Sequence, residues 1–487
     1  MRVLLVLALA PPILAQQAAP QNPTSAAGAS RPLNDQSRNV DEMFGQWHSP
    51  KSPGAAVLVI DAGRVVHAKG YGMANLEHGV PIRADTVFDI ASVSKQFGAM
   101  AVALLEADGR IGLDDDVRRY VAEVPDFGKT ITLRHLIHHT SGIRDWPGTL
   151  SMGGWNYQDV VSFNQILRMA YHQRELNFAP GDEHTYSNTG YNLLAEVVAR
   201  VSGKSFREFC DERVFRPLGM KNTHFHDDHT EVVVNSADSY RPGPDGQFRR
   251  AVSNLTALGS SSLFTTVDDL AKWIDNFHSP RPIVGGPAVI ARLHERGRLN
   301  SGTTIAYAFG QSIGEYRGLR TATHTGSWAG YRSVLQRFPD QRFAVAILAN
   351  TADMNPSLVA RRISDLYLAD RFGRAPDTTP SAAQSGGGAG AAAPNAWRPT
   401  AADLQAYVGE YRSAELLTSY VLVVRGDQLI ARHFRTGEYI FRPVETDRFQ
   451  APIFGDVRFV RDASGAVLAF AANSERVRRL RFERVNR

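Results

Sequence analysis

The chain has 487 residues, of which 43% are hydrophobic and 21% charged, a composition that can bury a core and excludes a disordered or fibrous protein. Its 54 Lys and Arg residues and 49 Asp and Glu residues give a net charge of +5, too weak over this length to indicate nucleic-acid binding. The single cysteine, Cys210, excludes an internal disulfide and a cysteine-built zinc site. It follows Phe206 and Phe209 at helical spacing, which favours a buried structural thiol over a nucleophile.

Residues 1–15 have the pattern of a secretory signal peptide. Arg2 supplies a short positive end, an apolar run follows, and Ala15 is a suitable cleavage residue. The run is too short to cross a membrane, and no later segment stays apolar for the roughly 18 residues that a span requires. We therefore expect a secreted or periplasmic protein without a membrane span. Residues 16–33 are rich in Ala, Gln, Pro and Ser and are expected to be a disordered leader.

Order is expected from residue 34, where a helix pattern begins. Residues 55–72 contain two apolar runs around Asp61-Ala-Gly63, which predicts a hairpin. Residues 90–280 read as mostly helical and include an amphipathic helix that ends at Gly203.

The rest of this unit reads as two more strands, 330–338 and 342–350, joined through Pro339-Asp-Gln341 and followed by a helix. We place the end of the domain at residue 374, so that it spans 34–374. Residues 375–397 are rich in Gly, Ala, Pro and Ser and are expected to be a flexible linker.

Residues 398–487 contain short strands of alternating polarity at regular spacing, separated by turn residues such as Asp462-Ala-Ser-Gly465. That pattern predicts a second domain, a small antiparallel barrel or sandwich.

The sharpest chemical signal is FDIASVSKQFGAM, in which Ser92 and Lys95 are three residues apart on a segment that reads as a helix. At this spacing both side chains share one helix face. A serine hydroxyl is a weak nucleophile until a neighbour takes its proton, and a lysine can do so once desolvation lowers its pKa. The spacing occurs at many helix starts, so it indicates catalysis only together with other motifs.

Two further strings occur in order along the chain: Tyr186-Ser-Asn188, and His324-Thr-Gly326 directly before an apolar strand. Together with Ser92-x-x-Lys95, they resemble the three motifs of the serine β-lactamase and penicillin-binding-protein superfamily. The match is closest to the class C and D,D-peptidase branch and covers residues 34–374. The carboxy-terminal strands resemble the lipocalin-like domain that some members carry.

The resemblance implies an α+β fold in which an antiparallel sheet is flanked by helices, with an all-helical lobe beside it and the carboxy-terminal all-β barrel after it. It also implies that Ser92 attacks the substrate carbonyl, while Lys95 and Tyr186 share proton transfer because a nearby cation lowers a phenol's pKa. Which of the two is the base stays open. The backbone N–H groups of Ser92 and Ser327 would form the oxyanion hole. The substrate-binding residues that the resemblance implies are Asn188, His324, Thr325, Gly326, Ser327 and Trp328.

Many β-lactamases have lysine where this chain has His324. Because histidine is mostly neutral at pH 7, binding of a substrate carboxylate is less assured and efficient β-lactamase activity is disfavoured. We expect an exported acyl-serine hydrolase of small peptides or esters, with D-amino-acid peptides as the leading substrates (D,D-carboxypeptidase or D-aminopeptidase type). The alternatives are a carboxylesterase or weak β-lactamase with the same site, and a penicillin- or peptidoglycan-binding module with little turnover.

Two groups of histidines compete with this interpretation. His135, His138 and His139 have the spacing of zinc ligands on one helix face, and residues 224–229 contain three more histidines and two aspartates. The first group lies at an expected helix end and the second in a polar loop, so a structural role is favoured for both. We expect no metal and no cofactor. The expected partners are a small-molecule or peptide substrate, with peptidoglycan fragments as a candidate.

Overall fold

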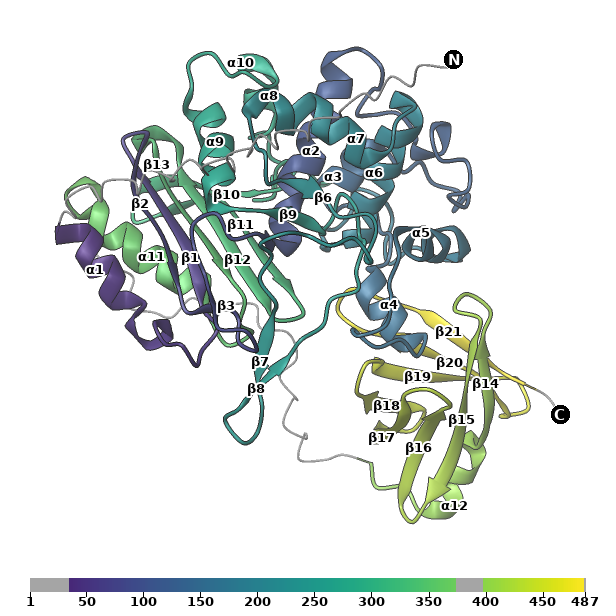
Figure 1. Cartoon of the computed structure of the whole chain (residues 1–487). Coiled ribbons are helices and arrows are strands. Elements are labelled where there is room, and N and C mark those ends of the chain that lie inside the picture. Colours follow the sequence, from purple (N-terminus) through teal and green to yellow (C-terminus); the bar gives the residue numbers. More distant parts are fainter. Residues whose placement is uncertain (1–34, 374–396, 486–487) are drawn as a thin grey trace, which may run out of the picture.

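The computed structural model describes residues 35–373 and 397–485, which form a helix-flanked sheet and a carboxy-terminal barrel (Figure 1). The predicted signal peptide, the leader and nearly all of the predicted linker lie outside the described residues.

Six antiparallel strands form the central sheet, in the order β10-β11-β12-β13-β1-β2. The predicted hairpin around Asp61-Ala-Gly63 is present as β1 and β2, and the first strand of the domain pairs with its last, Ala55 opposite Ala349. The strands predicted at 330–338 and 342–350 are β12 and β13. The strands of this sheet are β1 (Ala55–Asp61), β2 (Arg64–Tyr71), β10 (Ser312–Tyr316), β11 (Leu319–Trp328), β12 (Tyr331–Phe338) and β13 (Phe343–Ala349).

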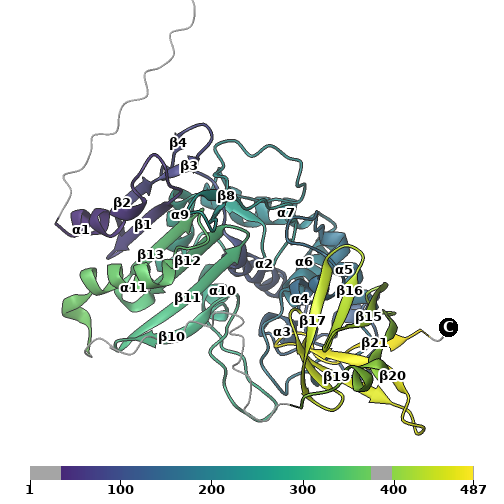
Figure 2. The same ribbon diagram turned by 90° about the horizontal axis from the view of Figure 1, so that it is seen from below.

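Helices cover both faces of this sheet, as Figure 2 shows from below. Each face of the sheet packs against its own hydrophobic core, and alternate residues of β1 belong to the two cores because successive side chains of a strand point to opposite faces. Val57 packs in the core formed with α1 (Asp35–Met43) and α11 (Pro356–Tyr367). Leu58 packs in the core that includes α2 (Lys95–Ala107) and α9 (Val267–His278). A sheet buried on both sides explains why β1 and β13 read as continuous apolar runs.

The helical lobe lies beside the sheet. Its amphipathic helix α6 ends where the sequence predicts, at Gly203, which adopts the left-handed conformation (φ 74°) that favours glycine. Among the described residues, no helix is both long and apolar enough to cross a membrane. The remaining helices of this domain are α2 (Lys95–Ala107), α3 (Leu133–Ile137), α4 (Trp146–Met152), α5 (Phe163–His172), α6 (Asn188–Ser202), α7 (Phe206–Cys210), α8 (Arg216–Leu218) and α10 (Gly286–Arg292).

The short strands of this domain form small sheets outside the central sheet. Three of them form one small sheet in the order β5-β9-β6, and β5 leads directly into the turn that carries Ser92. The short strands are β3 (Met73–Asn75), β4 (Val80–Pro81), β5 (Phe88–Asp89), β6 (His224–Phe225), β7 (Tyr240–Pro242), β8 (Phe248–Arg250) and β9 (Leu263–Thr265).

The carboxy-terminal domain is a closed antiparallel barrel of the eight strands β14 to β21. Packed aromatic rings fill its interior, with centroid separations of 4.6 Å for Phe470–Phe482 and for Tyr407–Phe459. Both parts of the predicted fold class, the helix-flanked antiparallel sheet and the all-β barrel, are thus confirmed. The elements are α12 (Ala401–Leu404), β14 (Gly409–Ser413), β15 (Thr418–Arg425), β16 (Gln428–His433), β17 (Gly437–Glu445), β18 (Arg448–Ala451), β19 (Gly455–Arg461), β20 (Val467–Asn473) and β21 (Leu480–Arg484).

Candidate active site

Ser92 lies on a short helical turn, η2 (Ala91–Ser94), that continues into α2. The residue before it, Ala91, adopts a left-handed conformation with φ of 47°, which is strained for a residue with a side chain. The buried carboxylate of Asp89 holds this turn by accepting a hydrogen bond from the Ala91 N–H at 2.8 Å. The half-buried Ser92 is therefore presented from a sharply defined position.

Lys95, one turn later, has a fully buried side chain in contact with three oxygen atoms. Its Nζ donates to Asn188 Oδ1 at 2.6 Å and to the Ser260 carbonyl at 2.7 Å, and it lies 3.2 Å from Ser92 Oγ. The structure thus brings the first and second sequence motifs together, and Asn188 orients the amine toward the serine.

Burial lowers the pKa of Lys95 well below its usual range. Two side chains modulate that effect in opposite directions: Asp145 raises the pKa of Lys95 and Arg476 lowers it. A lysine whose ammonium form is disfavoured in this way can act as a base toward a neighbouring hydroxyl.

Tyr186 places its ring 4.8 Å from Lys95 Nζ and packs against the His139 ring at a centroid distance of 4.2 Å. Burial raises the pKa of Tyr186 above its usual range, although the neighbouring Ser92 hydroxyl acts in the opposite direction. The net effect is opposite to the lowering expected from a lysine cation, because desolvation is the largest contribution to the pKa and Arg476 supplies the positive charge that opposes it. Tyr186 is a neutral phenol in the resting site.

The third motif, His324-Thr-Gly326, lies within strand β11. The apolar strand that the sequence predicts after it is β12. Gly326 is needed there because a Cβ at this position would overlap the Ser333 hydroxyl and the Ile90 carbonyl. This close packing sets β11 against the turn of Ser92, so that Ser327, the next residue, lies beside it. Thr325 and Ser327 share the exposed face of β11.

His324 is on the buried face of β11, and both of its ring nitrogens have a hydrogen-bond partner. Its Nδ1 donates to the Thr325 carbonyl at 2.7 Å, so its Nε2 accepts from the Tyr307 hydroxyl at 3.0 Å. Burial and the nearby Lys95 lower the pKa of His324 to about 3. A neutral imidazole with both nitrogens occupied cannot supply the cation that a substrate carboxylate requires.

Trp328 lies at the end of the same strand, 9% exposed. Its ring packs against Trp146 and Tyr157 at centroid distances of 5.5 and 5.4 Å, and its Nε1 donates to Ser253 Oγ at 2.8 Å. The indole is held rigidly as part of an aromatic cluster beside β11.

Asp145 links Asn188 to the second domain. Its buried carboxylate accepts from the Asn188 N–H at 2.8 Å and from Nδ2 at 2.9 Å, and it pairs with Arg476 Nη1 at 3.3 Å. Arg476 belongs to the loop between β20 and β21 of the barrel, and its guanidinium also lies over the Tyr186 ring, 4.9 Å from the centroid. The barrel thus contributes a cation to the catalytic centre.

Backbone and side-chain bonds fix this β20–β21 loop (residues 474–479) in place. The Arg476 carbonyl accepts from the Asp145 N–H at 3.2 Å and from Asn177 Nδ2 at 2.9 Å. Nearby, the fully buried Arg144 pairs with Glu415 of the barrel and donates to the Arg478 carbonyl at 3.0 Å. Figure 1 shows the barrel next to α4, where these contacts occur.

Sequence reasoning missed five residues that shape the site. Asp145, His139 and Ser260 lie within the region 90–280 that reads as mostly helical, but no motif marks their contacts, and the sequence indicates His139 only as a candidate zinc ligand. Arg476 and Tyr307 carry no local signal, because only folding brings them to the site. Together with the predicted set, the site contains His139, Asp145, Ser260, Tyr307 and Arg476.

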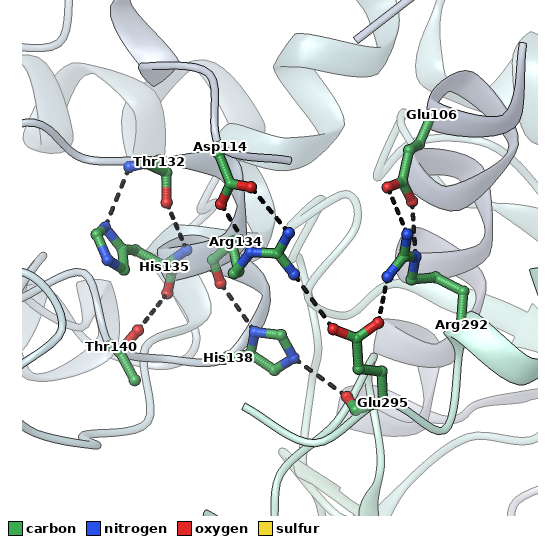
Figure 3. A network of polar contacts seen from close by, with 9 residues as sticks. All are labelled: Glu106, Asp114, Thr132, Arg134, His135, His138, Thr140, Arg292 and Glu295. Carbon is green, nitrogen blue, oxygen red and sulfur yellow. Dashed lines mark hydrogen bonds and ion pairs between the residues drawn. The ribbon is translucent and has the colours of Figure 1, made fainter. Parts of the chain in front are cut away.

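The first group of histidines does not converge on one point. His135 accepts from the Thr132 N–H as part of a helix cap, while the ring nitrogens of His138 face the carbonyls of Arg134 and Glu295 at 3.1 and 3.3 Å (Figure 3). His139 Nδ1 instead accepts a hydrogen bond from the N–H of Ser187, the residue after Tyr186, at 3.2 Å. These histidines serve the fold, as the sequence favours. Cys210 is buried, and burial raises the pKa of its thiol.

A serine contacted by a buried lysine, with an asparagine and a tyrosine converging on the same lysine, defines the class as a serine hydrolase. A model of the Beta-lactamase family matches residues 40–370. The chain therefore belongs to the β-lactamase family, and the superfamily resemblance drawn from its motifs is confirmed.

Similar proteins include a penicillin-binding protein of Bacillus subtilis, 30% identical over 63% of this chain and 70% of the relative. A D-aminopeptidase of Gluconobacter oxydans is 26% identical over 61% of this chain and 56% of its own length. Among solved structures, the octameric penicillin-binding protein homologue from Pyrococcus abyssi is 24% identical with a TM-score of 0.61, covering 91% of this chain and 99% of that chain. That likeness extends the shared fold to the barrel.

Proposed function

We propose that this protein is an exported acyl-serine hydrolase of the D,D-carboxypeptidase type, acting on small peptides that end in a D-residue with a free carboxylate. The observation that carries the substrate class is the position of Arg476. His324 is neutral, so it cannot hold an anion, whereas an arginine guanidinium is cationic throughout the physiological range. Arg476, 39% exposed at the side chain, pairs with Asp145 through Nη1 and lies over Tyr186. The remaining N–H donors of its guanidinium support binding of a substrate carboxylate at this position.

The preference for D-residues in the substrate is inferred from similar proteins, and export is inferred from the amino-terminal residues. Curated relatives named D-aminopeptidase in two bacteria are 26% and 27% identical to this chain. Export is supported by the positive end, apolar run and cleavage residue within residues 1–15. Peptidoglycan fragments ending in D-alanine fit both features.

The chemistry follows from the contacts of Ser92 and Lys95. The Ser92 hydroxyl attacks the scissile carbonyl while the Lys95 amine takes its proton. The backbone N–H groups of Ser92 and Ser327 stabilise the oxyanion. The neutral Tyr186 phenol relays the proton from Lys95 to the leaving amine, and an acyl-enzyme on Ser92 remains. Water then attacks that ester while Lys95 accepts its proton. Lys95 returns this proton to Ser92 Oγ as the ester bond breaks, which releases the acid and restores the free serine.

The experiment compares acetyl-D-Ala-D-Ala with its C-terminal amide, which differs only in lacking the terminal charge. The wild type is expected to prefer the acid by about tenfold or more in kcat/KM, because a hydrogen bond to a charged group contributes about 1.5–3 kcal/mol. Arg476→Gln should remove this preference. Arg478→Gln, on the same loop but paired with Glu183, is the matched control and should keep it. An unchanged preference in Arg476→Gln would refute the role of Arg476.

The nucleophile is tested separately with p-nitrophenyl butyrate, an ester that places few demands on the binding site. Ser92→Ala should abolish hydrolysis while thermal unfolding stays unchanged. A mutant that kept most of its rate would contradict the assignment of Ser92. Intact mass after addition of a penicillin distinguishes turnover from the binding-module alternative, which predicts a stable adduct.

A D-aminopeptidase activity is the second candidate, favoured by the relatives that carry this name. Such an enzyme needs a carboxylate to receive the substrate ammonium. Asp145 is the carboxylate at this site, and Asn188 and Arg476 already engage it. Faster hydrolysis of D-alanine p-nitroanilide than of acetyl-D-Ala-D-Ala would nevertheless decide for the aminopeptidase.

A further inference from the structure

We propose that His224, His226 and Glu231 form a binding site for a divalent transition-metal ion, with Zn²⁺ as the best match, at the edge of the small β5-β9-β6 sheet. One donor atom from each of the three residues lies within 4.8 Å of the other two. Two imidazoles and one carboxylate are a common ligand set of Zn²⁺.

The local structure explains how the two imidazoles come to face the same side. His224 begins the short edge strand β6 and His226 directly follows it, where its N–H donates to the Ser262 carbonyl at 2.8 Å. The two histidines are two residues apart in extended backbone, so their side chains share a face, while Phe225 between them is buried in the core. Both rings pack against Phe264 on the neighbouring strand β9, at centroid distances of 5.8 and 4.5 Å. The two rings are therefore held in position before any ion binds.

The two imidazole donor atoms have no hydrogen-bond partner within the described residues. His224 Nε2 and His226 Nδ1 are both buried without a hydrogen bond, and the His226 side chain is only 9% exposed. They lie 4.0 and 3.6 Å from the same carboxylate oxygen of Glu231. Ligand atoms about 2.0–2.1 Å from a tetrahedral Zn²⁺ lie roughly 3.3 Å apart, so small side-chain rotations bring these three to bonding positions.

The unpaired imidazole nitrogens favour an occupant. A buried nitrogen without a hydrogen bond is unfavourable, and two such nitrogens face this site. A neutral imidazole nitrogen offers a lone pair that a metal ion can accept.

Arg207 is the group that opposes a cation here. It donates to both carboxylate oxygens of Glu231, at 2.8 and 2.6 Å, and to Asp227 at 2.7 Å. A carboxylate offers about four lone pairs, so Glu231 can hold Arg207 and still donate to an ion. Asp227 and Asp228 directly follow His226 in the chain. Three carboxylates against one guanidinium leave a negative local charge that attracts a cation.

The loop that carries Glu231 is anchored beyond the site. The Val87 N–H donates to the Asn235 carbonyl at 3.0 Å, and the Ala237 N–H donates to the Val87 carbonyl at 2.9 Å. Val87 directly precedes β5. A bound ion would thus join β6 to a loop that is already tied to the other edge of the small sheet, and the expected role is structural.

The test uses the full-length protein without a histidine tag, freed of metal with a chelator that is then removed. Titration with Co²⁺ should give visible absorption that saturates at about one equivalent. Addition of Zn²⁺ should abolish that absorption and raise the midpoint of thermal unfolding. His226→Asn and Glu231→Gln should each lose the signal, whereas His229→Asn, in the same segment but outside the cluster, should keep it.

Hydrolysis of p-nitrophenyl butyrate shows that each variant is folded, because none of these residues belongs to the catalytic site. Co²⁺ absorption that does not saturate in the wild type would overturn the proposal. The same conclusion would follow if a folded His226→Asn or Glu231→Gln variant bound Co²⁺ as well as the wild type does.

Discussion

At the scale of single residues, burial decides which groups of the site are charged. The same desolvation lowers the pKa of Lys95 and of His324 and raises that of Tyr186. Lys95 is thereby suited to take a proton and Tyr186 to donate one. Arg476, a charged group with a partly exposed side chain at the catalytic centre, comes from another domain. Residue identity alone does not give these states, since each depends on what covers the side chain.

The pH dependence of activity should report the charge on Lys95. As the base, Lys95 must be unprotonated, so kcat/KM should rise with pH through its pKa. Arg476 lowers that pKa, so Arg476→Gln should let Lys95 hold its proton longer. We expect the acid limb of the profile to move to higher pH by about half to one unit, measured with p-nitrophenyl butyrate, which carries no carboxylate. A shift to lower pH would contradict the assignment of Lys95.

At the scale of elements, the contact between β11 and η2 sets the catalytic geometry. Gly326 allows the strand to approach the Ile90 carbonyl, and Ser327 and Ser92 are thereby held on adjoining elements. The strained backbone at Ala91 is held by Asp89. The proposed oxyanion donors, the N–H groups of Ser92 and Ser327, thus lie on two packed elements that are more than 200 residues apart in the chain.

Gly326→Ala is expected to lower kcat for p-nitrophenyl butyrate by about 100-fold or more, since displacing one oxyanion donor costs that much. The clash with Ile90 and Ser333 should also lower the free energy of unfolding by about 1–3 kcal/mol. Gly314→Ala in β10 is the matched control, because a Cβ there meets only Thr321 Oγ1 at 3.6 Å. A wild-type rate in Gly326→Ala would show that the close approach does not matter.

At the scale of the whole molecule, the barrel contacts the candidate active site directly. Its aromatic interior is filled, so its contribution lies in the loops, and the β20–β21 loop reaches Asp145 and Tyr186. The docking relies on a buried ion pair between Arg144 and Glu415. Such a pair is costly to break from one side, because a buried charge is left without its partner.

Glu415→Ala should loosen the docked barrel by about 3–5 kcal/mol. Hydrogen–deuterium exchange of residues 474–479 should accelerate by about 100-fold or more, and the preference for a substrate carboxylate should fall with it. Glu445→Ala is the control within the same barrel, since its pair with Arg448 is exposed and contributes less than about 1 kcal/mol. Equal exchange in both variants would mean that Glu415 does not hold the domains together.

Local patterns were enough to predict much of this protein. The hairpin at Asp61-Ala-Gly63, the helix end at Gly203 and the repeating strands of the barrel follow from periodicity and turn chemistry, which act over a few residues. Ser92 and Lys95 were indicated by their helical spacing, and Asn188 by the resemblance of the three motifs to those of the superfamily. The order of the motifs along the chain identified the family.

Tertiary structure alone decided the electrostatics and the partners of these residues. Sequence spacing could not show that His324 is neutral and fully bonded, because that depends on Tyr307 and on burial. It could not show that Arg476 reaches Tyr186 across a domain boundary, since loop closure over such a distance leaves no local signal. Nor could it show that the Glu231 carboxylate lies close to the rings of His224 and His226, because Glu231 is five residues further along the chain than His226. Periodicity and turn residues act over a few positions and can be recognised in the sequence. Desolvation and long-range contacts arise only when the chain folds.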